Sequence, residues 1–189
     1  MRNSRRGAVD PFIVMDVMEA ARQAEEAGRS IIHMEVGQPS TPAPSAARDA
    51  LAQAMRDDAL GYTVALGLPA LRKRIARLYG DWYRVDLNPD RVVVTPGSSG
   101  GFILAFSAFF DGGQTVALGA PGYPSYRQIL RALDLKVNEI PASPDNRYML
   151  TPEDLRGQVF DGLLMASPGN PTGTMLDKPA LSALIETAQ

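Results

Sequence analysis

Apolar residues in the first part of the chain recur at the three- and four-residue spacing of amphipathic helices. This spacing predicts helices over residues 11–27, 45–56 and 68–83. Gly28 is suited to end the first helix, because glycine commonly closes a helix at its carboxyl end. Ser45 is suited to cap the second, because a serine oxygen can accept an N–H bond from the first turn.

Beyond residue 91 the pattern changes to short β-favouring runs that alternate with longer amphipathic segments. The runs predicted as strands, together with one earlier run, are residues 30–36, 92–95, 115–118, 136–140 and 162–166. The segments predicted as helices are 102–110, 124–133, a brief one capped by Thr151, and a last one opening at Asp177. Such alternation is typical of α/β proteins. We therefore predict a three-layer fold, with a mainly parallel sheet, helices on both its faces, and a preceding N-terminal helical arm.

The amino-acid composition mainly excludes certain kinds of site and partner. The chain has 189 residues, no cysteine and one histidine, and carries 19 basic against 21 acidic residues. The lack of cysteine excludes a disulfide scaffold, a thiolate nucleophile and a cysteine zinc site, and the single histidine argues against a histidine-rich metal site. The balanced charge gives no attraction to nucleic acid or membrane. The longest apolar run, 102–110, is too short to span a bilayer and is interpreted as a buried helix. We expect a cytoplasmic protein with no nucleic-acid, membrane or metal partner.

Ligands of open α/β sheets bind beyond the carboxyl ends of the strands, so the loops there are the candidate sites. The first is the turn Thr95–Gly101, rich in glycine and serine and followed by a helix. Small residues and the N–H groups of a helix start favour an anion such as a phosphate. An ordinary strand-to-helix turn is the alternative, since the segment matches neither the P-loop nor the dinucleotide fingerprint.

Three more loops carry residues suited to binding. The loop 120–126 presents Tyr123, which could stack on a planar ring or pack against the following helix. Asn170 precedes a proline that holds its backbone extended, so its amide can aim at a ligand oxygen. Gly37 lets a backbone N–H approach a carboxylate, although a simple tight turn explains it equally well.

Together these segments resemble the class I and II aminotransferases, which are fold-type I pyridoxal-phosphate enzymes. The segments that carry the resemblance, in the family's order, are Val36–Pro39, Gly61–Thr63, Gly67–Arg72, Gly97–Ser99, Pro121–Tyr126 and Asn170–Gly173. The resemblance covers the chain from about Ile31 onward. It implies that residues 1–37 form an N-terminal arm and part of a small domain, and that residues 38–189 form the first part of the large pyridoxal-phosphate-binding domain.

The same resemblance implies roles for individual residues. Ser98 and Ser99 would hold the phosphate of pyridoxal 5'-phosphate, Tyr123 would stack on its pyridine ring, and Asn170 would hydrogen-bond the ring's phenolic oxygen. Tyr62 would reach the cofactor of a neighbouring subunit, which implies a homodimer.

Substrate binding and reaction follow from the family in the same way. Gly37 would lie beside the substrate carboxylate. The expected reaction transfers an amino group from an amino acid to a 2-oxo acid. Open alternatives are a carbon-sulfur lyase of the same fold, the aminotransferase-like domain of a transcription regulator, and a non-catalytic chain.

Catalysis in this family needs a Schiff-base lysine and an acidic partner for the pyridine nitrogen. Neither is found at a matching position, and the family places both beyond Gln189. The lysines Lys73, Lys136 and Lys178 have ordinary explanations on a polar helix face, a strand start and a first helical turn. We expect the chain to be a truncated N-terminal part, inactive alone. His33, in an apolar run, is interpreted as packed rather than catalytic.

Overall fold

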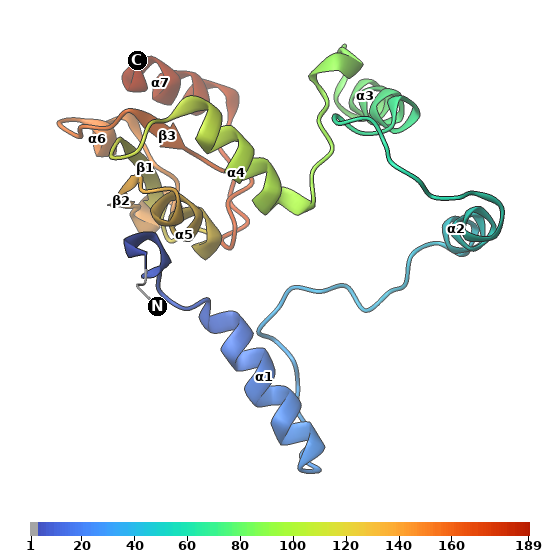
Figure 1. Cartoon of the computed structure of the whole chain (residues 1–189). Coiled ribbons are helices and arrows are strands. Elements are labelled where there is room, and N and C mark those ends of the chain that lie inside the picture. Colours follow the sequence, from blue (N-terminus) through green and yellow to red (C-terminus); the bar gives the residue numbers. More distant parts are fainter. Residues whose placement is uncertain (1–3) are drawn as a thin grey trace. The chain divides into compact units, whose positions relative to one another are not determined.

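The computed structural model describes residues 4–189 (Figure 1). Contacts divide this part of the chain into two compact units. One comprises residues 4–12 with 97–189 and is called the sheet unit below. The other comprises residues 13–96 and is called the helical unit. The predicted domain boundary after residue 37 stays a prediction.

The sheet unit is a parallel α/β structure. Its strands are β1 (Thr115–Ala120), β2 (Lys136–Pro141) and β3 (Gly162–Leu164). Its helices are α4 (Gly97–Phe109), α5 (Pro124–Ala132), α6 (Pro152–Leu155) and α7 (Lys178–Ala188), with 3-10 turns η1 (Arg5–Gly7) and η3 (Pro144–Asn146). The strand order is β2-β1-β3, with β1 parallel to both neighbours. The predicted parallel sheet is confirmed.

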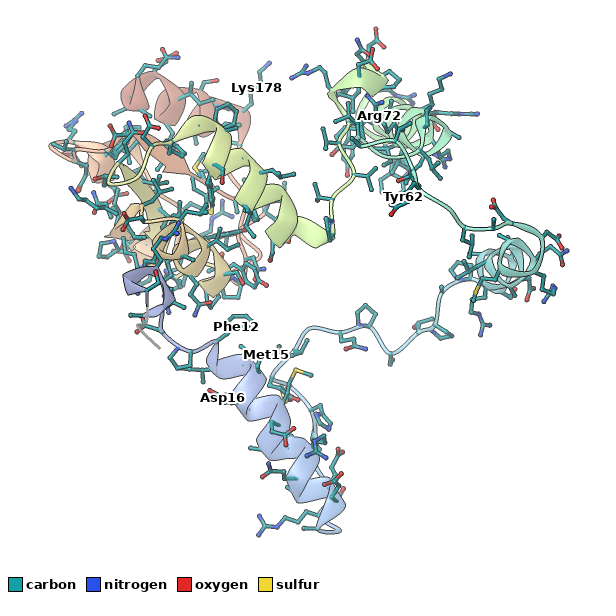
Figure 2. The ribbon with its side chains drawn as sticks, in the orientation of Figure 1. Phe12, Met15, Asp16, Tyr62, Arg72 and Lys178 are labelled. Carbon is teal, nitrogen blue, oxygen red and sulfur yellow. The ribbon has the colours of Figure 1, made fainter. Side chains whose placement is uncertain are left out.

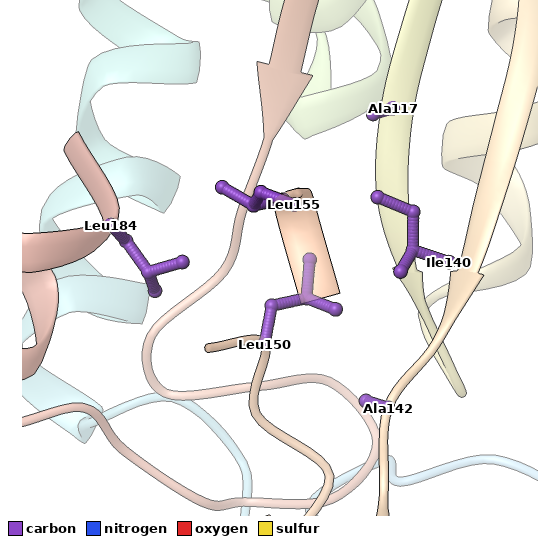
Figure 3. Packing of buried hydrophobic residues seen from close by; sticks show 6 residues of the cluster. All are labelled: Ala117, Ile140, Ala142, Leu150, Leu155 and Leu184. Carbon is purple, nitrogen blue, oxygen red and sulfur yellow. The ribbon is translucent and has the colours of Figure 1, made fainter. Parts of the chain in front are cut away.

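The central strand β1 sends alternate side chains to opposite faces of the sheet, as a strand must. Val116 and Leu118 join a buried cluster that includes Phe106 of α4 and Leu130 of α5. Ala117 joins a second cluster, shown in Figure 3, whose other buried members are Ile140, Ala142, Leu150, Leu155 and Leu184. Leu155 belongs to α6 and Leu184 to α7. Helices therefore cover both faces of the sheet, which confirms the three-layer prediction.

Two helix starts of the sheet unit, those of α6 and α7, follow the predicted capping chemistry. At α6, both the backbone N–H and the hydroxyl of Thr151 donate to a carboxylate oxygen of Asp154, at 2.8 and 2.7 Å. At α7, the carboxylate of Asp177 accepts from the backbone N–H of Ala180 at 2.9 Å. Such caps satisfy polar groups that a helix end leaves without intrahelical partners.

The helical unit contains α1 (Ile13–Glu26), α2 (Ser45–Asp57), α3 (Pro69–Tyr83) and the 3-10 turn η2 (Pro89–Arg91). All three predicted helices are confirmed. Gly28 has a φ of +80° and follows the end of α1, as predicted. Ser45 is not the cap of α2, because Pro44 occupies that position and Ser45 is already helical.

Two predicted strands are wrong. Among the described residues, neither 30–36 nor 92–95 forms a strand. A strand exists only when a neighbour accepts and donates its backbone hydrogen bonds. Val94 donates one such bond, to the carbonyl of Leu66 at 3.1 Å, but no ladder extends from it.

Helix α4 also departs from expectation. It begins at Gly97, so the glycine-serine turn forms its first turn rather than a separate loop. Phe106 is buried under the sheet, whereas Ile103, Leu104 and Phe109 are exposed, the last by 77%. The interpretation as a buried helix therefore holds for one side only. No helix among residues 4–189 combines the length and apolarity needed to cross a membrane.

Candidate functional site

The carboxyl ends of β1 and β3 form a crevice, because these neighbouring strands lead to opposite faces of the sheet. β1 continues into α5, which packs on the Phe106 side, and β3 continues toward α7, which packs on the Leu184 side. In open parallel sheets, ligands bind where neighbouring connections diverge in this way. A cavity of about 40 Å³ lies at this point. Its lining includes residues from β1 and β3 and from the loops that follow them, namely Leu118, Gly119, Gly122, Leu164, Met165 and Asn170.

The loop after β1 makes a tight turn at the cavity. A Cβ added to Gly122 would lie 2.7 Å from the carbonyl oxygen of Gly119, closer than real side chains come to backbone. Only glycine fits there without a shift of the backbone. The turn brings the chain directly to Tyr123, the residue before α5.

Aromatic rings connect this loop to α4. The Tyr123 and Tyr126 rings meet edge to face with centroids 5.3 Å apart, and Tyr126 meets Phe102 of α4 at 5.0 Å. Tyr126 lines the cavity. Burial raises the pKa of the Tyr126 phenol, and the neighbouring Tyr123 adds to the effect. Tyr123 is thus packed through its contact with Tyr126 and follows the end of β1 by three residues, but it is not among the residues that line the cavity.

The loop after β3 is held by its own hydrogen bonds. Gly169 donates to the carbonyl of Thr174 and accepts from the N–H of Gly173, both at 2.8 Å. The hydroxyl of Ser167 accepts from the N–H of Leu176 at 3.0 Å. Asn170 sits in this loop, exposed and at the cavity wall. Its predicted position at a binding site has a geometric basis, and its role stays a prediction.

Ser98 and Ser99 occupy the first turn of α4, a helix of 13 residues, and both are exposed. The first N–H groups of a helix lack intrahelical partners and attract anions. Phe102, one turn later, contacts Tyr126, so the middle of α4 packs against the first turn of α5. The two serines belong to the same sheet unit as Tyr123 and Asn170. Their phosphate-binding role stays a prediction.

Gly37 and Tyr62 belong to the helical unit. A Cβ at Gly37 would meet no other atom within 4 Å, so nothing in this chain requires glycine there. The Tyr62 side chain is fully exposed (Figure 2). The substrate role of Gly37 and the intersubunit role of Tyr62 both stay predictions.

His33 differs from its interpretation as a packed histidine in a strand. Its ring is about half exposed and lies between two carboxylates, with Nδ1 at 2.6 Å from Glu35 and Nε2 at 3.0 Å from Glu25. The hydrogen bonds to Glu35 and then Glu25 raise its pKa to about 9. The residue therefore joins the end of α1 to the segment that leads to Gly37. Within residues 4–189, no group of three or more His, Asp or Glu residues is arranged to hold a metal.

Two aromatic residues near the site were not singled out from the sequence. Tyr148 lines the cavity and has a φ of +58°, which is uncommon for a bulky residue. Phe12 precedes α1 and meets Tyr123 edge to face at 6.1 Å. The only sequence signal for Tyr148 is its place after a Pro-Asp-Asn turn, and for Phe12 its place after Pro11. Neither signal indicates that Tyr148 lines the cavity or that Phe12 contacts Tyr123.

Comparison with known proteins agrees with this geometry. The family model described as aminotransferase class I and II matches residues 29–189. A valine–pyruvate aminotransferase of Mycobacterium tuberculosis is 45% identical over 185 residues, which are 97% of this chain and 48% of that protein. Among solved structures, an aminotransferase from Mycobacterium tuberculosis is 44% identical with a TM-score of 0.93, covering 99% of this chain and 49% of that one.

A more distant structure gives the same fold. The aspartate aminotransferase from Thermus thermophilus with maleate is 27% identical, with a TM-score of 0.90, covering 100% of this chain and 50% of that one. The chain spans about half the length of the relatives it matches. The predicted family is confirmed, because the match extends over most of the chain. The chain belongs to the class I and II aminotransferase family.

Proposed function

We propose that this chain provides the phosphate-binding and ring-stacking side of a pyridoxal-phosphate-dependent aminotransferase site. The observation that carries the proposal is the crevice between β1 and β3, which has Asn170 at its wall and the Tyr123 loop beside it. Family membership supports the cofactor, since class I and II aminotransferases use pyridoxal phosphate.

The chemistry of the residues fits this cofactor. A phosphate requires several hydrogen-bond donors, and the start of α4 offers hydroxyls and helix N–H groups at Ser98 and Ser99. A planar ring requires a flat partner, which Tyr123 can provide. The cavity of about 40 Å³ has room for roughly three water molecules. The cavity therefore has room for only part of the cofactor.

Each residue then has a definite task. Ser98 and Ser99 donate hydrogen bonds to the phosphate and fix one end of the cofactor. Tyr123 restrains the ring plane, and Asn170 donates an amide N–H to the ring's anionic oxygen, which favours the ionised form. The bound cofactor supplies an electron sink for the substrate carbon next to the amino nitrogen.

We also propose that the Schiff-base amine comes from sequence outside these residues. Lys136 begins β2, whereas the cavity lies at the carboxyl ends of the strands, about 17–20 Å away for a six-residue strand. Lys178 is exposed in the first turn of α7, and Lys73 belongs to α3 of the helical unit. The complete protein would act as a homodimer, with Tyr62 reaching the partner's cofactor.

For the complete protein we propose transfer of an amino group from an amino acid to a 2-oxo acid. Valine and pyruvate are the first pair to assay, because a valine–pyruvate aminotransferase is 45% identical to this chain. An aspartate donor is the comparison, because aspartate aminotransferases are among the more distant relatives. Release of pyruvate from a sulfur-containing amino acid in the same assay would favour the lyase instead.

The cofactor proposal is tested on the 189-residue chain itself. Pyridoxal phosphate is added, the mixture is reduced with borohydride, and any modified lysine is located by peptide mass spectrometry. We expect slow labelling scattered over all three lysines. In parallel, pyridoxamine 5'-phosphate, which cannot condense with lysine, is titrated by equilibrium dialysis and is expected to bind. Stoichiometric labelling of one lysine would contradict the missing-amine proposal, and absence of any binding would contradict the cofactor proposal for this chain.

A further inference from the structure

Residues 4–12, the N-terminal segment that precedes α1, contact α5. The turn η1 contacts α5, and Asp10 forms an ion pair with Arg131 at 2.6 Å. The side-chain amide of Gln128 donates to the carbonyl of Asp10 at 3.0 Å and to that of Pro11 at 3.3 Å. Gln128 and Arg131 are one turn apart on α5, so the segment is held at two points.

These contacts are coupled to the sheet. Arg131 also approaches Glu139 of β2 at 3.7 Å, and Arg127 approaches the same carboxylate at 3.4 Å. Partly exposed ion pairs contribute little stability individually. The hydrogen bonds from the Gln128 amide matter more for position, because they fix the backbone immediately before Phe12.

Phe12 follows this anchor and meets Tyr123. Their ring centroids are 6.1 Å apart and the planes are at 89°, an edge-to-face contact. On another side, Tyr123 contacts Tyr126 at 5.3 Å and 79°. Tyr123 therefore has an aromatic neighbour from α5 and another from the N-terminal segment, and its ring orientation depends on both.

We propose that Phe12 is a positioning residue that holds the Tyr123 ring ready to stack on a planar ligand. The inference rests on the proposed function, since it takes Tyr123 as the stacking ring. Without the Phe12 ring, the Tyr123 ring loses one of its two aromatic neighbours and can change its orientation more freely. Binding of the ligand must then also restrain that ring, and affinity falls.

The test uses four variants of the 189-residue chain. Phe12→Ala removes the contact, Phe12→Leu keeps apolar bulk without a ring, and Phe12→Tyr restores a ring. Phe109→Ala is the matched control, because Phe109 belongs to α4 of the same unit but its side chain is 77% exposed. Two measurements are made on each variant: the ring signals of Tyr123 in a chain with ¹³C-labelled tyrosine, assigned with Tyr123→Phe, and the dissociation constant for pyridoxamine 5'-phosphate.

We expect Phe12→Ala and Phe12→Leu to shift the Tyr123 ring signals and to weaken ligand binding about threefold to tenfold, the range of an aromatic pair. Phe12→Tyr should keep both the Tyr123 ring signals and the ligand affinity close to those of the original chain. Phe109→Ala should change neither quantity. If Phe12 only supported the fold, the apolar bulk of leucine would be sufficient. Tyr123 signals and ligand affinity in Phe12→Leu that equal those of the original chain would therefore overturn the inference.

The outcomes also separate this inference from the proposed function. If the ligand shifts the Tyr123 signals equally, and with equal affinity, in the original chain and in Phe12→Ala, the inference fails while the cofactor site stands. If the ligand binds the original chain without affecting the Tyr123 signals, or does not bind, the stacking role fails and the inference falls with it.

Discussion

Gly122 faces the carbonyl oxygen of Gly119 so closely that a Cβ at residue 122 would lie 2.7 Å from it. Gly122→Ala should therefore displace the loop that carries Tyr123 and destabilise the sheet unit by about 1–3 kcal/mol. Urea denaturation checks the stability. Gly112→Ala is the matched control, because its added carbon would come no nearer than 3.7 Å to another residue, the Asp134 carboxylate. Equal stability of the two variants would contradict the close approach.

Gly162 begins β3 beneath the Phe110 ring. A Cβ there would lie 2.6 Å from Cε1 of Phe110 and nearer still to Cζ. We expect Gly162→Ala to cost about 1–3 kcal/mol, because the ring has to move. Adding Phe110→Leu should recover part of that loss, and the double-mutant cycle measures how much. Strictly additive effects would show that the two residues are not in conflict.

The chain has one histidine, so the titration of His33 can be followed through a single imidazole signal. Its pKa is raised to about 9 by Glu35 first and Glu25 second. Because the folded-state pKa exceeds the usual value of about 6.5, the stabilisation is fully present below pH 6.5 and is lost as the pH rises through about 9. The NMR titration of the ring protons measures this pKa directly.

Substitutions identify the cause. Glu35→Gln should lower the His33 pKa more than Glu25→Gln does. Glu26→Gln should leave it unchanged, since Glu26 pairs with Arg22 instead. A His33 pKa near 6.5 in the original chain would contradict the bridge between the two carboxylates.

Asn170 is exposed in a loop that is held by other residues, so its side chain can be removed without unfolding the site. Asn170→Ala should weaken binding of pyridoxamine 5'-phosphate about tenfold, as expected for a hydrogen bond to an anionic oxygen. Equilibrium dialysis measures the effect. Asn138→Ala removes an amide from β2 and should leave affinity unchanged. Unchanged affinity in Asn170→Ala would remove this residue from the proposed site.

The sequence predicted helices well and strands less well, for a local reason. Helix α3 has its apolar spacing and its opening Pro69 within one segment, and it was placed within a residue of its observed bounds. The runs 30–36 and 92–95 have the composition of strands but form none in the described chain. A helix satisfies its hydrogen bonds internally, whereas a strand depends on a neighbour that its own residues do not specify.

Residues of the candidate site differ in the same way in how far the sequence points to them. Asn170 and Tyr123 were singled out because proline and glycine mark their loops, and both loops follow strands of the sheet, while their binding roles stay predictions. Phe12 was missed, since it lies more than a hundred residues from Tyr123 and no local pattern joins them. His33 was assigned to an apolar strand, but its partners Glu25 and Glu35 are set by the way the chain turns after α1.

The sequence by itself determined the α/β class, the three helices of the helical unit, the family, and the loops suited to a phosphate and a ring. These features depend on spacing, caps and turn residues that act over a few positions. Only the tertiary structure decided the strand order β2-β1-β3, the crevice between β1 and β3, and the packing of Phe12 on Tyr123. These depend on which distant segments meet, and that choice is made by burial of the whole apolar surface rather than by any short pattern.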